Sequence, residues 1–154
     1  MGKKSKSPSS KKKIAIVVSG FYKDVSDGLL QGAVDEIHSA GISDKSINIF
    51  RCPGSFEIPI TARKLCASKK YGAVICLGAV IKGETAHFEY ISYAVTKGIM
   101  QLNIEYGIPV TFGVLTCYNE QQAAARSKPG GKNKGAEAAR AAIEMMSLLK
   151  SISN

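Results

Sequence analysis

Short apolar runs alternate along this chain with segments of helical periodicity, and the alternation limits the folds open to it. We expect strands at residues 13–19, 47–50, 73–77 and 110–115, and the first and third are continuous apolar runs. Continuous apolar strands are typical of parallel sheets that helices cover on both faces. The sequence therefore predicts a three-layer α/β sandwich with a four-stranded parallel sheet, helices on both faces and right-handed crossovers.

Apolar residues at intervals of three and four predict the helices between these strands. Val25, Leu29, Ala33 and Ile37 share one face of a segment that ends before Gly41, a suitable C-cap. The expected helices are residues 25–40, 58–67, 85–106, 121–126 and 135–152.

Charge divides the chain into an arm and a domain. Residues 1–13 hold six lysines and no acid, so +3 of the formal charge of +9 remains for everything after them. We expect residues 1–12 to be a disordered basic arm and residues 13–154 to be a single domain. A nucleic-acid-binding domain would carry its charge on the folded face, so we expect no nucleic-acid partner.

The spacing of the cysteines and the lengths of the apolar runs indicate in which compartment of the cell the protein is found. Cys52, Cys66, Cys76 and Cys117 form no C-x-x-C pair, which predicts four reduced thiols and no metal site. The longest apolar run, residues 73–81, is far shorter than the ~20 residues of a membrane span. We expect a soluble cytoplasmic protein with no membrane partner.

In parallel α/β sheets ligands bind beyond the carboxyl ends of the strands, and polar residues collect at those ends here. Residues 77–87 run from a buried strand through a glycine-containing turn into a helix, whose first N–H groups can bind an anion. Glu84 and Thr85 fit that role or simple helix capping. His87 lies about one turn into this helix and is a candidate proton shuttle or a structural histidine.

Two further segments offer candidates. After the second strand, Phe56 and Glu57 follow Ser55, and a carboxylate there could accept hydrogen bonds from ligand hydroxyls. Phe21, after the first strand, is either a core residue or a stacking platform for a flat heterocycle. Arg126 precedes a glycine- and lysine-rich loop, which is either solvated or holds phosphate, although no phosphate-loop motif is complete.

The order of four segments is more specific than any one of them. They are residues 54–59 (GSFEIP), 78–90 (GAVIKGETAHFEY), 109–116 (PVTFGVLT) and 133–139 (NKGAEAA). Together they resemble the 6,7-dimethyl-8-ribityllumazine synthase family, over residues 13–146. The chain departs from the family pattern at residues 116–119 and 127–132. The resemblance implies a flavodoxin-like fold and the penultimate reaction of riboflavin biosynthesis, a transferase reaction without a cofactor.

In that reaction 5-amino-6-(D-ribitylamino)uracil condenses with 3,4-dihydroxy-2-butanone 4-phosphate to 6,7-dimethyl-8-ribityllumazine, releasing phosphate and water. By motif position, the resemblance implies His87 as the proton donor and acceptor. It implies Glu84, Thr85 and Arg126 as phosphate-binding residues. The remaining implied substrate-binding residues are Phe21, Ser55, Phe56, Glu57, Ala79, Val80, Ile81, Phe112 and Lys134.

The resemblance also implies partners. Family members are rings of five with active sites shared between subunits, and some build an icosahedral capsid of 60 subunits. Arg126 and Lys134 are eight residues apart, a spacing that permits a capsid. Riboflavin synthase is a further candidate partner. Two other functions stay open: a non-catalytic lumazine- or riboflavin-binding or shell-forming protein of the same fold, and a nucleic-acid or assembly protein that uses the arm.

Overall fold

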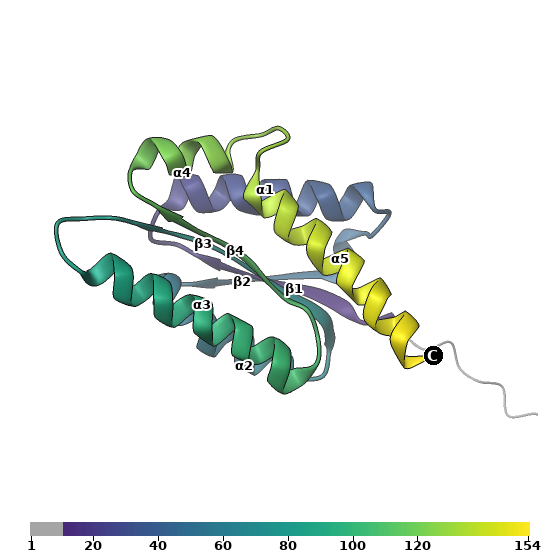
Figure 1. Cartoon of the computed structure of the whole chain (residues 1–154). Helices are drawn as coiled ribbons and strands as arrows, with labels where there is room; N and C mark the ends of the chain where they lie inside the picture. The colour runs from purple at the N-terminus through teal and green to yellow at the C-terminus, as the bar shows by residue number, and fades with distance from the viewer. Residues whose placement is uncertain (1–10) are drawn as a thin grey trace, which may run out of the picture.

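The computed structural model describes residues 11–154, which form a four-stranded parallel sheet between two layers of helices (Figure 1). The strands are β1 (Lys13–Ser19), β2 (Ile47–Cys52), β3 (Tyr71–Ile81) and β4 (Val110–Cys117), in the spatial order β2-β1-β3-β4. All three strand pairs are parallel, which confirms the expected α/β fold. The predicted basic arm lies outside the described residues except for its last two.

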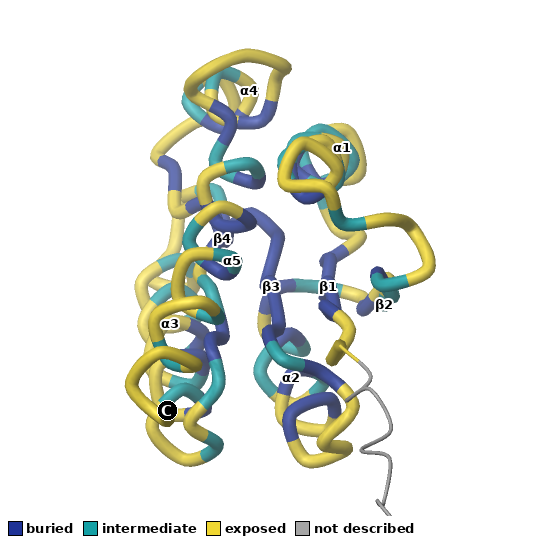
Figure 2. Tube along the Cα trace, turned by 90° about the vertical axis from the view of Figure 1, so that its right-hand side faces the viewer, coloured by how far each residue is buried: buried dark blue, intermediate teal, exposed yellow. Residues whose placement is uncertain are grey.

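The helices cover both faces of the sheet. They are α1 (Lys23–Ser39), α2 (Ile58–Ala67), α3 (His87–Tyr106), α4 (Glu120–Ser127) and α5 (Lys134–Ser153), with 3₁₀ turns η1 (Asp44–Ser46) and η2 (Ser55–Glu57). Helices α1 and α5 pack on one face and α2 and α3 on the other, and Figures 1 and 2 show the two layers from perpendicular directions. Helix α4 lies beyond the end of β4, beside α1.

Alternate side chains of the strands build one apolar core under each helix layer. In β3, Ile75 and Leu77 pack toward α1 and α5, whereas Val74 and Cys76 pack toward α2 and α3. All four are fully buried, and β3 is drawn mostly in the dark blue of buried residues in Figure 2. A strand buried on both faces has no polar position, which explains the continuous apolar run of the sequence.

Two predicted boundaries are wrong at the carboxyl end of β3. The strand does not turn at Gly78 but continues to Ile81, because residues 78–81 stay paired with β4. A side chain at Gly78 would meet Ser19 and Ser55, so this glycine serves close packing rather than a turn. Helix α3 begins at His87 and not at Thr85, so His87 is its first residue rather than one turn inside.

Candidate functional site

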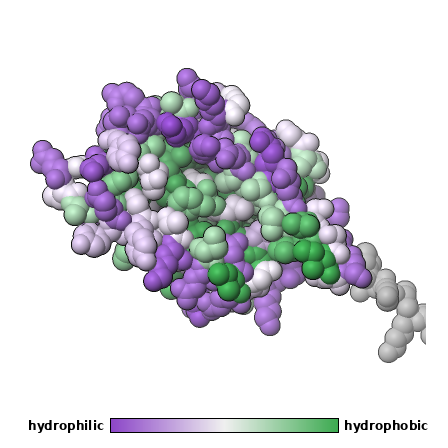
Figure 3. Space-filling model, in the orientation of Figure 1, coloured by the Kyte–Doolittle hydropathy of each residue, from purple (hydrophilic) through white to green (hydrophobic). Residues whose placement is uncertain are grey.

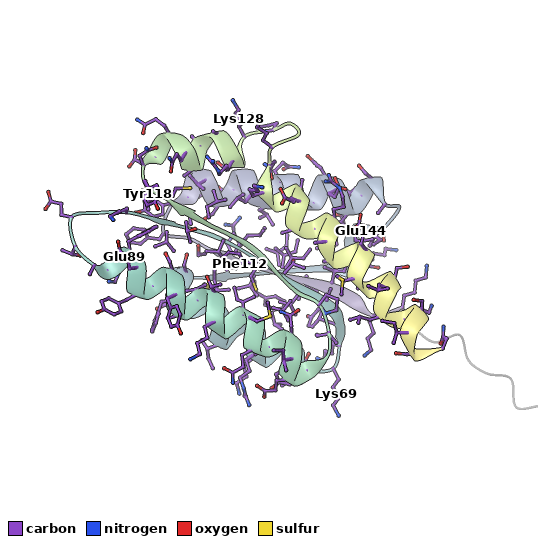
Figure 4. The ribbon with its side chains drawn as sticks, in the orientation of Figure 1. Lys69, Glu89, Phe112, Tyr118, Lys128 and Glu144 are labelled. Atoms are coloured by element: carbon purple, nitrogen blue, oxygen red, sulfur yellow. The ribbon has the colours of Figure 1, made fainter. Side chains whose placement is uncertain are left out.

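A cavity of about 440 Å³ lies along the outer edge of β4. Its wall includes Phe112 from the first half of β4, Arg126 from the last turn of α4 and Lys134 from the first turn of α5. Figure 4 shows Phe112 on this edge between α3 and α5, with Tyr118 at the junction of β4 and α4. The structure thus brings together three predicted substrate-binding residues from three elements.

The two cations of this cavity differ in their partners. Arg126 is exposed, donates from Nη1 to the carbonyl of Gln122 at 3.0 Å, and has no carboxylate within ion-pair distance among residues 11–154. Lys134 is paired with Glu137, with Nζ and Oε2 2.6 Å apart. Burial raises the pKa of the Cys117 thiol in the cavity wall, and the positive charge of Arg126 opposes that rise. The free guanidinium is the better placed group to bind an anion.

The sequence reasoning missed most of the wall of the same cavity, including the side chains of Tyr118, Gln122 and Glu137. Gln122 Oε1 accepts from the backbone N–H of Tyr118 at 2.8 Å, and Asn119 caps α4 by accepting from the backbone N–H of Gln122 at 2.9 Å. These bonds fix the turn that leads from β4 to Arg126. A polar residue before a helix could have indicated the cap, whereas no motif marks the other positions.

A second group of predicted residues follows β2. Ser55 is buried, and its hydroxyl donates to the carbonyl of Ala79 at 3.1 Å, which ties η2 to β3. Phe56 is 60% exposed and lines a cavity of about 370 Å³ with Glu57 and residues of α2 and α3. Phe21 is 74% exposed after β1, its ring edge-on to Tyr22 with centroids 4.9 Å apart. Phe21 is therefore no core residue, and the core alternative is wrong.

Residues 79–81, which were also predicted to bind substrate, are the last three residues of β3. Ala79 and Val80 are 4% and 8% exposed and belong to the two apolar cores, while Ile81 is half-buried.

The start of α3 holds a third group. Glu84, Thr85 and His87 are all exposed, and Thr85 Oγ1 accepts from the backbone N–H of His87 at 3.4 Å. Just before this segment, Lys82 pairs with Glu89 at 2.9 Å, and its ammonium lies 5.8 Å from the ring centre of Tyr118. The hydrogen bond to Glu89 raises the pKa of Lys82, and the same bond lowers the pKa of Glu89. The pair joins the two ends of the segment that carries Glu84 and Thr85.

One chain does not bring all the predicted residues to a single crevice. Strands β2 and β4 are opposite edges of the sheet, three strand spacings or about 14 Å apart. Phe112 lies five residues before the end of β4, which is about 16 Å from the carboxyl edge of the sheet. Phe112 therefore lies away from the residues that follow the strands, because its side chain projects from within an edge strand.

Two further observations concern metal ions and membranes. Among residues 11–154, no three His, Cys, Asp or Glu side chains lie close enough together to hold a metal ion. None of the helices in that range has the length and apolarity needed to cross a membrane.

The parallel sheet with helices on both faces defines an α/β protein of flavodoxin-like fold, with aromatic and cationic side chains in a cavity along its β4 edge. Residues 11–150 match the family model of 6,7-dimethyl-8-ribityllumazine synthase. The chain belongs to this family.

Curated relatives carry the same name. The 6,7-dimethyl-8-ribityllumazine synthase of Desulfotalea psychrophila (strain LSv54 / DSM 12343) is 49% identical over 141 residues, which cover 92% of this chain and 91% of the relative. Those of Anaeromyxobacter sp. (strain K) and Anaeromyxobacter dehalogenans (strain 2CP-1 / ATCC BAA-258) are each 46% identical over 140 residues, 91% of this chain and 86% of theirs. These matches confirm the resemblance drawn from the motifs.

Proposed function

We propose that this chain condenses 5-amino-6-(D-ribitylamino)uracil with 3,4-dihydroxy-2-butanone 4-phosphate to form 6,7-dimethyl-8-ribityllumazine, releasing phosphate and water. The family match over residues 11–150 carries the proposal. The cavity along β4 supports it, because two cationic groups beside an aromatic ring suit a phosphorylated substrate next to a flat heterocycle. The reaction is the transferase step before riboflavin itself in riboflavin biosynthesis.

Arg126 binds the phosphate of the butanone substrate in this proposal. Its guanidinium has no competing carboxylate among the described residues, so it can form a bidentate contact with a phosphate. Lys134 adds positive charge from the same cavity wall. Glu84 and Thr85 contribute backbone N–H groups near the start of α3, where the helix dipole favours a negative charge.

The pyrimidine substrate occupies the side of the site formed after β1 and β2. Phe21 stacks on the uracil ring, and its exposed ring is free to do so. Phe56 and Glu57 hold the ribityl chain, with Ser55 fixing their turn through its bond to Ala79. Residues 79–81 and Phe112 complete the surroundings of the ring.

The reaction moves protons at the amine nitrogen of the uracil and at the ketone oxygen of the butanone. The free amine of the uracil attacks the ketone carbon, water leaves as the imine forms, and loss of phosphate and ring closure give the lumazine with a further water. His87 accepts and donates these protons, since an imidazole exchanges protons readily near neutral pH. Its exposed position as the first residue of α3 supports this role, because a partly open histidine can reach a substrate.

The active site is shared between copies of the chain. Phe112, Arg126 and Lys134 lie at the β4 edge, whereas Phe21 and Phe56 follow strands at and near the opposite edge. A second copy placed against the first would bring one group to the other and cover apolar surface. Figure 3, which faces the β4 edge, shows exposed apolar residues between hydrophilic rims. Exposed Phe56, Ile60, Tyr90, Tyr93, Met100 and Ile104 add apolar surface on η2, α2 and α3.

We propose a ring of five chains, with an icosahedral capsid of twelve rings as the larger assembly. Sedimentation or light scattering measures this directly. A mass of one chain would refute the shared site, whereas a mass of five chains would refute only the capsid. Riboflavin synthase is proposed as a further partner.

The deciding experiment mixes the purified protein with both substrates and follows the absorbance and fluorescence of the lumazine. We expect turnover well above the spontaneous reaction of amine and ketone. Binding of lumazine or riboflavin without turnover would instead identify a non-catalytic carrier. Removal of residues 1–12 should leave turnover intact, whereas salt-sensitive RNA binding lost on that removal would favour a nucleic-acid role for the arm.

We place this enzyme in the cytoplasm. All four cysteines are free and buried, as expected of a protein from a reducing compartment.

A further inference from the structure

Asn133 is a buried polar residue in the segment that joins Arg126 to Lys134. The residue is 4% exposed, although residues 128–132 before it are all exposed. The amide nitrogen Nδ2 lies within hydrogen-bond distance of three carbonyls: Gly28 at 3.1 Å, Ser127 at 2.9 Å and Lys128 at 3.1 Å. The amide oxygen accepts from the backbone N–H of Ala136 at 3.1 Å. One side chain therefore joins α1, the end of α4 and the start of α5.

Helix capping explains only half of this arrangement. A cap requires the oxygen of Asn133 alone, which accepts from the first turn of α5. Asn119 performs that simpler task for α4, and within residues 11–154 its nitrogen has no hydrogen-bond partner. The nitrogen of Asn133, with two hydrogens shared among three carbonyls, instead holds the loop against α1 and α4.

Helix α1 is shaped to receive this side chain and its loop. A Cβ on Gly32 would lie 2.2 Å from Asn133 Oδ1, and a Cβ on Gly28 would lie 2.3 Å from the carbonyl oxygen of Ser127. On the other side of the contact, a Cβ on Gly135 would lie 1.9 Å from the carbonyl oxygen of Leu29. Three glycines thus allow a backbone approach that no other residue type would permit.

We infer that Asn133 is a positioning residue for phosphate binding: its amide nitrogen fixes where the chain leaves Arg126 and enters Lys134, and so sets the placement of both cations in the cavity. The inference rests on the proposed function. Arg126 is one residue before Ser127, whose carbonyl accepts from Asn133, and Lys134 is the next residue after Asn133. A bidentate guanidinium contact depends on placement, so loosening this tether weakens the contact without touching the ligand.

The test separates capping from tethering by one substitution. Asn133→Ser keeps a side-chain oxygen for the α5 cap and removes the amide donor. We expect KM for the butanone phosphate to rise about tenfold, together with the inhibition constant of inorganic phosphate. We expect kcat and KM for the pyrimidine to stay within about twofold. Asn119→Ser is the matched control: serine keeps the capping oxygen that holds the turn before Arg126, and the amide nitrogen that is removed has no partner within residues 11–154, so all of these values should stay unchanged.

A double-mutant cycle shows whether Asn133 acts through the cations. In an Arg126→Ala background, Asn133→Ser should raise KM for the phosphate substrate by less than about twofold, since the main group it places is gone. An undiminished tenfold rise there would overturn the inference. So would an unchanged KM and phosphate inhibition constant in the single variant, or an equal loss of affinity for both substrates.

A second variant covers the case in which Asn133→Ser does not fold. Gly28→Ala keeps Asn133 but adds a Cβ too close to the Ser127 carbonyl, which must shift. This variant should therefore give the same rise in KM for the butanone phosphate alone. An unchanged KM in a folded Gly28→Ala protein would also refute the tether. A native protein that binds inorganic phosphate yet makes no lumazine would refute the proposed function alone, and the variants' phosphate affinities would still decide the role of Asn133.

Discussion

Substitution of Gly78 by alanine tests how closely the carboxyl ends of the strands are packed. An added Cβ would lie 2.4 Å from Ser19 Oγ, 3.0 Å from Ser55 Oγ and 3.1 Å from Ile58 Cδ1. Gly78 is buried in β3 between β1 and β4, so the strand cannot move away from these contacts alone. Overpacking of this kind costs about 1–3 kcal/mol of unfolding free energy.

For a domain of this length, each kcal/mol lowers Tm by about 2–4 °C. We therefore expect Gly78→Ala to melt roughly 2–12 °C below the native protein, measured by circular dichroism at one fixed protein concentration because assembly shifts Tm. Displacement of Ser55 by the added Cβ should also raise KM for the pyrimidine substrate, because the Ser55 hydroxyl ties the turn that carries Phe56 and Glu57 to β3.

Two further variants make this reasoning refutable. Ser19→Ala removes the oxygen at 2.4 Å, so the double variant Gly78→Ala/Ser19→Ala should recover part of the lost stability, a favourable coupling between the two sites. Gly83→Ala adds a Cβ with no atom within 4 Å and should change the free energy of unfolding by less than about 0.5 kcal/mol. A Gly78→Ala protein with native Tm would show that the strand ends are looser than described.

Three other outcomes follow from the site and the cores. Arg126→Ala removes a charge-assisted contact of ~1.5–3 kcal/mol, so KM for the butanone phosphate should rise roughly 10- to 100-fold, and an unchanged KM would remove Arg126 from the site. His87→Ala should slow turnover by about 100-fold or less, because one acid–base group contributes ~10²–10⁴-fold while proximity remains, and full activity from about pH 6 to 8 would refute the proton-transfer role. Burial raises the pKa of Cys52 and Cys66 to about 11, so at pH 8 a disulfide reagent should label them about 100-fold more slowly than a free thiol. Labelling at the free-thiol rate would contradict the burial of these two cysteines. Because folding raises their pKa values, the stability that the protonated thiols contribute to the folded state is complete below the ordinary thiol pKa of 9.0 and is lost as pH rises toward 11.

The architecture followed from the sequence because buried parallel strands leave a direct trace in it. Residues 13–19 were predicted with the bounds that β1 has, since both faces of that strand are covered. Gly107 ends α3 with a φ of +63°, a left-handed conformation that glycine adopts without strain, and this too was predictable. The end of β3 was not, because whether Gly78 turns or continues depends on Ser19 and Ser55, which only the fold brings near it.

For the candidate site, the motifs predicted residue types and the structure determined which of them meet. Arg126 and Lys134 flank one loop, so their closeness could be expected from eight residues of separation. Phe112 could not be placed with them by sequence alone, because an edge strand exposes its side chains sideways and no periodicity shows which strand forms the edge. Asn133 lay within a family motif, yet its donors act across α1, a contact between residues 105 positions apart.

The packing of α5 on α1 has a consequence for how the chain matures on the ribosome. Helix α1 ends at Ser39 and α5 begins at Lys134. At a synthesis rate of about 5–20 residues per second, synthesis of α5 therefore begins roughly 5–20 s after that of α1 is complete. During that interval the nascent chain exposes the Gly28–Gly32 face and the apolar side chains that α5 later covers. The half of the molecule proposed to bind phosphate is therefore completed last, and a chain stalled before Lys134 would contain all four strands but lack α5, whose first turn holds Asn133.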